Sequence, residues 1–369
     1  MGAGLIGTSI GLALERVGWD VLLLDKDHAR VDLAVQLGAG AVWQPQQRVE
    51  HAVLAVPPHA VAALLSEMQR REVAATFSDV GSVKDKSQQE IKTLTPDVTI
   101  FCGGHPIAGR ERSGPAAARP DLFEGRPWVL TPGPATGPAA INAAREVALA
   151  CGAEVLTMSA AAHDEAMALI SHVPQLLSSL LAARLESSPD AMLRLAGPGL
   201  RDTTRIAASD PALWSEVIAA NRVPTLTVLT ELAADLSDLL AALAGHTEGV
   251  TAQAAVLSTA DLTQVVYDLV SRGNAGRRRL PGKHGIRATY APVPVVIEDA
   301  PGRLAGLLAD ASAAGVNVED LVIEHAPGRP RGVAELAVRP EDAQRLATAL
   351  RARGWSVHVP AAAEAGSAD

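Results

Sequence analysis

The first 158 residues alternate short, β-branched apolar runs with longer stretches whose apolar positions recur at helical spacing. Apolar runs bounded by turn residues predict strands, and strands that alternate with helices predict a parallel, doubly wound α/β sheet. The predicted strands are "DVLLLD" (20–25), "HAVLAV" (51–56), "ATFSDV" (75–80), "VTIFCGG" (98–104), "PWVLTP" (127–132) and "AEVLTM" (153–158).

From residue 159 to 274 the strand pattern disappears, and Leu- and Ala-rich helical periodicity replaces it. This part is predicted to be an all-helical domain. Its segment "VPTLTVLTELAADLSDLLAALAGH" is apolar around much of its circumference, which indicates packing against another helix or another subunit.

After a Gly-, Arg- and Pro-rich linker (275–290), the pattern becomes β-α-β-β-α-β over residues 291–361. This order is the ferredoxin-like arrangement. The small, polar residues of the tail (362–369) are predicted to be disordered.

Composition narrows the class of protein. Apolar residues make up 48% of the chain, charged residues 20%, and the formal net charge is −9, so we expect a soluble protein rather than a nucleic-acid binder. No membrane helix or signal sequence is expected, and a cytoplasmic location fits both this and the cysteine count. The two cysteines, Cys102 and Cys151, are too few for a disulfide framework, lack metal-ligand spacing, and are predicted to be buried.

A glycine fingerprint stands at the start of the chain. Gly2, Gly4 and Gly7 form G-x-G-x-x-G directly before a helical run, and Asp25 ends the next predicted strand 18 residues after Gly7. This pattern is typical of a dinucleotide site, in which the helix N-terminus binds the pyrophosphate and the acidic residue binds the adenosine ribose. A chance Gly-rich turn is the alternative.

Further residues are expected to line this cofactor site: Leu5, Ile6, Val56 and Pro57. The carboxylate of Asp25 would repel a 2′-phosphate and so favours NAD over NADP, a preference that Lys26 and Arg30 weaken without reversing.

The fingerprint has almost no residues in front of it, although the strand that delivers such a turn lies centrally in a doubly wound sheet. Without that strand, buried backbone groups would lose their partners at a cost of about 1–3 kcal/mol each. We therefore expect that Met1 is not the true start and that about ten residues of apolar strand precede it.

Two loops after predicted strands carry candidate catalytic groups. Ser82 follows one strand in "DVGSVKDK", and His105 stands at the carboxyl end of the next in "GGHPIAGRERSG". Ligands of open α/β sheets bind at this edge, and an imidazole is a suitable general base at neutral pH. A structural or surface histidine is the alternative.

A third segment, "GPGLRDTTRIAASDPALWSEVIAANR" (197–222), carries several arginines in the helical part. A guanidinium is a natural clamp for a small carboxylate. By itself the segment would be interpreted as a helix cap with surface ion pairs.

The motifs "GAGLIGTSIGLAL", "SDVGSVK", "HPIAGRERSG", "HDEAMALISHVPQ" and "GPGLRDTTRIAASDPALW" occur in an order that resembles the prephenate/arogenate dehydrogenase family of tyrosine biosynthesis, over about residues 1–285. The resemblance implies a Rossmann domain, a helical dimerisation domain that makes a homodimer, and NAD(P)-dependent oxidative decarboxylation that needs no metal. The substrate implied is prephenate, which becomes 4-hydroxyphenylpyruvate, or arogenate, which becomes tyrosine.

The resemblance also implies residue roles. His105 would take the proton of the ring 4-hydroxyl as hydride leaves for the nicotinamide, and Ser82 would orient that hydroxyl. Arg205 would bind a substrate carboxylate, and His172 and Trp214 would line the pocket.

Two acidic residues, Glu111 and Asp202, match positions that order or guard the pocket. The chain departs from many relatives at Gln175, where a second histidine is common, and at Arg110, where a small or polar residue is common. These departures leave the fine recognition of the substrate open.

The C-terminal "DAPGRLAGL" and "AAGVNVEDL" resemble an ACT domain, a regulatory module that binds amino acids. Tyrosine is the effector that this resemblance implies, and a purely structural appendage is the alternative.

Two other functions remain open: a catalytically inactive amino-acid sensor on the same folds, and a β-hydroxyacid dehydrogenase. The latter would be expected to use a lysine early in the helical domain, and residues 159–274 contain none.

Overall fold

The computed structural model describes residues 1–109, 114–244, 262–280, 290–325 and 330–358. These residues fall into two compact units, 1–235 and 236–369, which are described separately. The predicted tail, most of the predicted linker, Arg110 and Glu111 lie outside the described residues. The predicted boundary near residue 158 falls inside the first unit, between a strand and a helix, and stays a prediction.

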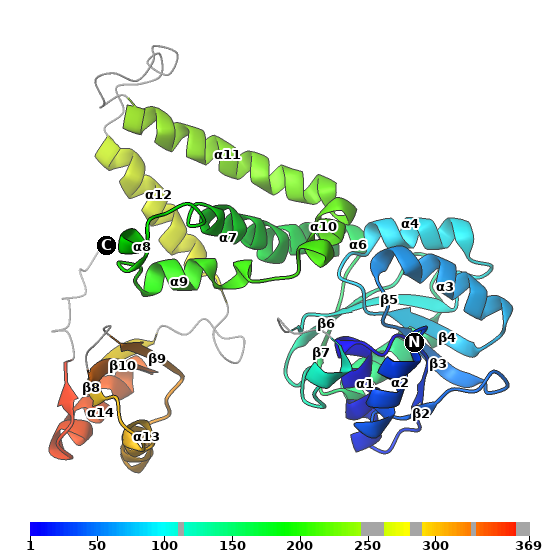
Figure 1. Cartoon of the computed structure of the whole chain (residues 1–369), viewed down its shortest axis with the longest axis horizontal. Coiled ribbons are helices and arrows are strands. Elements are labelled where there is room, and N and C mark those ends of the chain that lie inside the picture. The colour runs from blue at the N-terminus through cyan, green and yellow to red at the C-terminus, as the bar shows by residue number, and fades with distance from the viewer. Residues whose placement is uncertain (110–113, 245–261, 281–289, 326–329, 359–369) are drawn as a thin grey trace. The chain divides into compact units, whose positions relative to one another are not determined.

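The first unit begins with an α/β part in which helices and strands alternate (Figure 1). Its elements are α1 (Leu5–Arg16), β1 (Leu22–Leu23), α2 (His28–Gln36), β2 (Ala41–Val42), β3 (Val49–Leu54), α3 (Pro58–Arg70), β4 (Ala74–Asp79), α4 (Asp85–Leu94), β5 (Phe101–Pro106), the 3₁₀ turn η1 (Pro115–Ala117), β6 (Pro127–Thr131), α5 (Pro138–Ala150) and β7 (Glu154–Thr157). Each of the six predicted strands is found, and β2 is an additional one.

The strands form a sheet in the order β3-β4-β5-β6-β7 and a separate parallel pair, β1-β2. The prediction of an entirely parallel sheet is wrong at one place, because β5 and β6 pair antiparallel. A parallel pair needs a crossover, usually a helix. Between β5 and β6 the described chain holds only the short turn η1, whereas the helix α5 lets β6 and β7 pair in parallel.

The first two residues bridge the two sheets at one end. The Met1 amino group donates to the Val53 carbonyl at 2.8 Å, Ala55 N donates to Met1 O at 2.7 Å, and Gly2 N donates to Leu24 O at 2.7 Å. A cavity of about 880 Å³ lies next to these contacts, lined by residues of α1, β1 and β3. Residues before Met1 stay a prediction.

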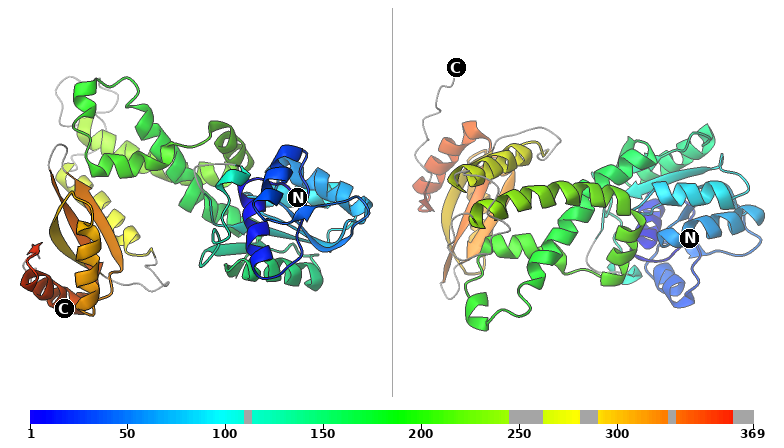
Figure 2. Two further views of the ribbon diagram at one scale, coloured as in Figure 1. Left: turned by 60° about the horizontal axis from the view of Figure 1, so that its bottom comes forward. Right: turned by 90° about the horizontal axis from the view of Figure 1, so that it is seen from above.

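Helices cover both faces of the five-stranded sheet (Figures 1 and 2). On one face α1 and α5 pack on β5 and β6 around a buried cluster that includes Cys102, Phe123 and Leu130. On the other face α3 and α4 pack on β3 and β4 around Leu65 and Phe77. Both cysteines are buried and unpaired, as predicted.

The rest of the first unit is helical. It comprises α6 (Ala160–Met167), the π-helical turn η2 (Ala168–His172), α7 (Val173–Ala183), α8 (Asp190–Leu193), α9 (Pro198–Thr204), the 3₁₀ turn η3 (Arg205–Ala207), α10 (Pro211–Ala220) and the first part of α11 (Arg222–Ala244). Pro174 lacks the N–H that would continue the α-helical ladder, which accounts for the π-helical turn just before α7.

The second unit contains α12 (Leu262–Arg277) and the predicted β-α-β-β-α-β order: β8 (Ala291–Glu298), α13 (Arg303–Ala313), β9 (Asp320–His325), β10 (Arg331–Val338), α14 (Pro340–Ala352) and β11 (Ser356–Val357). The strands pair antiparallel in the order β11-β8-β10-β9. Inward positions of β8 and β10 pack on α13 and α14 in a core of their own. The ferredoxin-like prediction is therefore confirmed.

Candidate functional site

The glycine fingerprint forms a tight loop that opens α1. A Cβ atom on Gly2, whose φ is +95°, would lie 2.2 Å from Ala55 O, and one on Gly7 would lie 1.9 Å from Gly2 O. A Cβ on Gly4 would meet no protein atom within 4 Å, and no side chain caps the helix that follows Gly4. The unpaired N–H groups of this helix terminus therefore face an accessible position, which fits the pyrophosphate of a dinucleotide.

Asp25 lies beside this loop. Its Oδ2 accepts from Ala3 N at 2.7 Å, and its Oδ1 accepts from Asp27 N at 2.9 Å. The turn with Val56 and Pro57 follows Ala55, the residue in contact with Gly2. The predicted cofactor residues thus come together around one loop.

A buried ion pair organises the loop between β4 and α4. The Lys84 Nζ donates to Asp79 and, at 2.7 Å, to Gly104 O, and both charged side chains are at most 2% exposed. Asp79 also accepts from Gly81 N and Gly104 N, each at 3.0 Å. Asp79 therefore ties the loop that holds Ser82 to the strand that holds His105.

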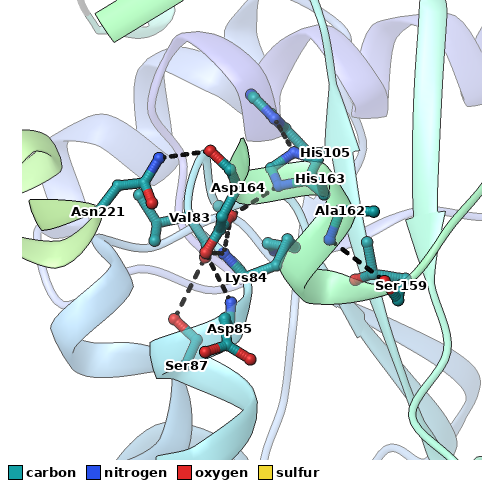
Figure 3. A network of polar contacts seen from close by, with 12 residues as sticks. Val83, Lys84, Asp85, Ser87, His105, Ser159, Ala162, His163, Asp164 and Asn221 are labelled. Carbon is teal, nitrogen blue, oxygen red and sulfur yellow. Dashed lines mark hydrogen bonds and ion pairs between the residues drawn. The ribbon is translucent and has the colours of Figure 1, made fainter. Parts of the chain in front are cut away.

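His105 lies near the carboxyl end of β5, as predicted, and its ring contacts a second histidine. Its Nδ1 is 2.8 Å from the Nε2 of His163, and the two rings meet edge to face. The Nδ1 of His163 is in turn 2.7 Å from Asp164 Oδ1 (Figure 3). Burial, followed by the neighbouring His163, Lys84 and His172, lowers the pKa of His105 well below 6.5, so its ring is neutral at neutral pH.

His172 belongs to the same buried region. Asn221 Nδ2 donates to the Asp164 backbone carbonyl at 2.8 Å and to His172 Nδ1 at 2.9 Å. His172 therefore accepts at Nδ1 and carries its proton on Nε2, where it can donate. Its ring packs edge to face on Trp214, with 6.1 Å between centroids. Burial lowers the pKa of His172.

The remaining predicted substrate residues are placed differently. Ser82 lies in the loop before Lys84, whereas Arg205 in η3 and Asp202 in α9 are exposed. Within the described chain, neither of these two side chains joins the polar contacts around His105. Glu111 lies outside the described residues. Gln175 is buried and donates to Ser209 at 2.7 Å, so it links α7 to the segment after η3.

Several buried residues that form the polar contacts around His105 had no predicted role: Asp79, Lys84, His163, Asp164 and Asn221. All of them are at most 3% exposed. The sequence signal that could have identified two of them is the pair His163–Asp164 at the start of an apolar helix, since two adjacent ionisable residues there need buried partners.

Comparison with protein families matches two consecutive segments of the chain. The nucleotide-binding domain of prephenate dehydrogenase matches residues 10–157, and the dimerization domain of prephenate dehydrogenase matches residues 159–251.

Individual relatives agree with this match. The chain is 39% identical over 358 residues to a probable prephenate dehydrogenase, NovF, from Streptomyces niveus, which covers 96% of this chain and 97% of the relative. It is 34% identical over 265 residues to a cyclohexadienyl dehydrogenase from Zymomonas mobilis, covering 67% of this chain and 88% of the relative.

A solved structure shares the fold. The crystal structure of prephenate dehydrogenase from Aquifex aeolicus, in complex with hydroxyphenyl propionate and NAD⁺, superposes with a TM-score of 0.62 at 24% identity. The match covers 74% of this chain and 96% of that chain.

Proposed function

The chain belongs to the prephenate dehydrogenase family of NAD-dependent oxidoreductases, and we propose that it converts prephenate to 4-hydroxyphenylpyruvate with His105 as the general base. The observation that carries this proposal is the position of His105. A neutral histidine stands near the carboxyl end of β5, in the domain that also presents a dinucleotide loop, and ligands of α/β sheets bind at that edge.

His105 performs the proton transfer in this proposal. Its ring takes the proton of the ring hydroxyl as the hydride departs, and loss of the ring carboxylate as CO₂ makes the product aromatic. NAD, when bound, supplies the hydride acceptor. A positioned base contributes about 10²–10⁴-fold in rate, and orientation of the substrate contributes more.

Other residues bind and orient the substrate in this proposal. The Nε2–H of His172 is a donor for an anionic substrate, and Trp214 supplies an apolar wall beside it. Arg205 and Asp202 are exposed; in this proposal the Arg205 guanidinium binds a substrate carboxylate, and Asp202 orders or guards the pocket. Ser82 orients the substrate hydroxyl, and Glu111 remains a proposed pocket residue.

We propose a homodimer formed through the helical part. The apolar side chains of Leu180, Val223 and Leu226 on α7 and α11 are 60%, 66% and 61% exposed. Large exposed apolar side chains on these two helices support an interaction site in the helical part. The run Ala160–Ala183 is also apolar and long enough to span a membrane by length and composition alone, a test that core helices of soluble proteins pass. We expect a cytoplasmic protein, and light scattering should give the mass of two chains.

For the C-terminal unit we propose an ACT-like regulatory role with tyrosine as the effector. Its strand order supports this, as does Gly302, whose φ of +83° opens α13 directly after β8. Calorimetry of the full chain with tyrosine is the test, and the absence of heat would favour a structural role.

The function is tested by NADH formation with purified protein. Prephenate should be oxidised, and the His105→Asn variant should lose most turnover while it still binds NAD. Arogenate is measured in parallel because it differs only by an amino group in place of the side-chain keto group. Faster turnover of arogenate would reassign the substrate, and inactivity with both would favour an amino-acid sensor.

A further inference from the structure

Two side chains behind His105 have no role in the function proposed above. His163 and Asp164 are adjacent on α6, are 0% and 3% exposed, and connect to His105 through contacts of 2.8 and 2.7 Å (Figure 3). We propose that His163 and Asp164 are positioning residues that fix the tautomer of His105 and take over the proton that His105 removes from the substrate. The inference rests on the proposed role of His105 as the base.

For a neutral His163, the contacts determine where each proton lies. A carboxylate only accepts, so the Nδ1 of His163 must carry a proton and donate it to Asp164. The Nε2 of neutral His163 then has a lone pair and accepts from the Nδ1–H of His105. The lone pair of His105 is therefore on Nε2, the nitrogen left for the substrate. The opposite tautomer would have no lone pair to offer there.

Asp164 is itself held firmly. Its Oδ1 accepts from Lys84 N at 2.9 Å, and its Oδ2 accepts from Asp85 N at 2.8 Å, at the N-terminus of α4. Asn221 holds its backbone carbonyl. The carboxylate thus occupies a helix N-terminus, which favours negative charge and fixes the direction from which it faces His163.

The proton transfer balances without any further reactant. The substrate hydroxyl proton bonds to Nε2 of His105, and the Nδ1 proton of His105 passes to Nε2 of His163. His163 then carries both ring protons and a positive charge next to the Asp164 carboxylate. His105 is neutral again, and a buried charge is paired rather than isolated.

The charged groups around His105 favour moving the proton on to His163. The titratable and charged groups that face it are His163 on α6, Lys84 before α4, and His172 in η2. Lys84 is paired with Asp79, and none of the three is an acid that could stabilise a positive charge left on His105. The nearest carboxylate in the chain of contacts is Asp164, reached through His163.

Two variants of His163 separate its role in fixing the His105 tautomer from its role in accepting the proton. In His163→Leu both contacts are lost, and we expect kcat to fall about 10²-fold. In His163→Gln the amide oxygen can still accept from His105 and the amide nitrogen can still donate to Asp164, so the tautomer is kept but the proton cannot be taken, and we expect a fall of about 10-fold. The KM values for prephenate and NAD should change little in both.

Asp164→Asn tests the carboxylate. If the amide nitrogen of the introduced asparagine faces His163, the His163 ring must accept at Nδ1, which reverses the tautomers of both histidines and removes the lone pair from Nε2 of His105. If the amide nitrogen faces α4 instead, it meets a backbone N–H group, and two donors then point at each other. We expect kcat to fall at least as far as in His163→Gln. Ser178→Ala is the control, because Ser178 is a buried hydroxyl of the adjoining helix α7 without a hydrogen-bond partner in the described chain, and its removal should leave kcat unchanged.

A measurement that needs no turnover separates this inference from the proposed function. Histidine-selective NMR of the wild type should show His105 protonated on Nδ1. In His163→Gln the ring of His105 should titrate at higher pH, because the positive charge that a protonated His163 places beside His105, which lowers the pKa of His105, is gone. The acidic limb of kcat/KM should move upward with it.

The opposite results are equally clear. A His105 proton on Nε2, an unchanged His105 titration in His163→Gln, or a kcat within twofold of wild type in that variant would each overturn the proposal. If His163→Leu does not fold, the glutamine variant decides alone. If the wild type has no activity, the proposed function fails, and the NMR result still tests whether His163 and Asp164 fix the tautomer of His105.

Discussion

Replacing Lys84 by methionine tests how the buried ion pair supports the site. The ammonium donates to Asp79 and Gly104 O, and the two charged side chains are 1% and 2% exposed. Methionine fills nearly the same space, so the main effect is an Asp79 carboxylate left buried with only Gly81 N and Gly104 N as donors. Removing one partner of a buried pair costs about 3–5 kcal/mol.

A loss of this size is a large fraction of the stability of a domain, which is about 5–15 kcal/mol. We therefore expect a much lower urea midpoint, followed by circular dichroism, and a lower kcat because Asp79 ties the Ser82 loop to the His105 strand. Lys92→Met on the exposed side of α4 is the control and should change stability by less than about 0.5 kcal/mol.

The double variant Lys84→Met, Asp79→Asn completes the test. A neutral amide leaves no buried charge, so the double variant should be more stable than the sum of the two single effects predicts. A destabilisation by Lys84→Met below about 1 kcal/mol, together with additive effects in the double variant, would refute the reasoning.

Three further predictions concern the same unit. Burial lowers the pKa of His51 to about 4, whereas the same side chain in the unfolded chain takes up a proton near pH 6.5. The contribution of His51 to the free energy of unfolding is therefore complete above pH 6.5 and is lost as the pH falls toward 4. His51→Gln should remove this decline, which amounts to at most about 3 kcal/mol. Equal slopes of stability against pH in both proteins would contradict this. Gly7→Ala should destabilise the fold, because its Cβ would lie 1.9 Å from Gly2 O. Gly4→Ala should leave stability unchanged and raise the KM for NAD. Similar thermal midpoints for the two variants would argue against this loop geometry. His105→Asn should lower kcat by about 10²–10⁴-fold with NAD affinity retained in fluorescence titration, and unchanged turnover would remove His105 from the mechanism.

The sequence predicted the elements well where the signal is local. Alternation of strands and helices located β1 and β3 to β7 to within a few residues, and the order of the C-terminal elements was predicted completely. The antiparallel pairing of β5 and β6 was not predicted, because strand direction follows from the connection that a segment makes in space rather than from the periodicity of its side chains.

The candidate site divides in the same way. His105 was predicted from the Gly-flanked loop after a strand, and the family resemblance added His172 and Trp214. His163 escaped this reasoning although it directly contacts His105, because the two are 58 residues apart in the chain. A helical pattern shows that a polar residue lies on an apolar segment, but it does not show which partner satisfies it.

The sequence by itself determined the glycine loop, the order of the elements and the family, since backbone freedom, side-chain periodicity and motif order are properties of neighbouring residues. Only the tertiary structure decided which polar groups share the interior. Lys84 with Asp79, and His163 with both His105 and Asp164, are buried together because α4, β5 and α6 pack against one another. The cost of burying an unpaired polar group then requires each of these groups to be paired.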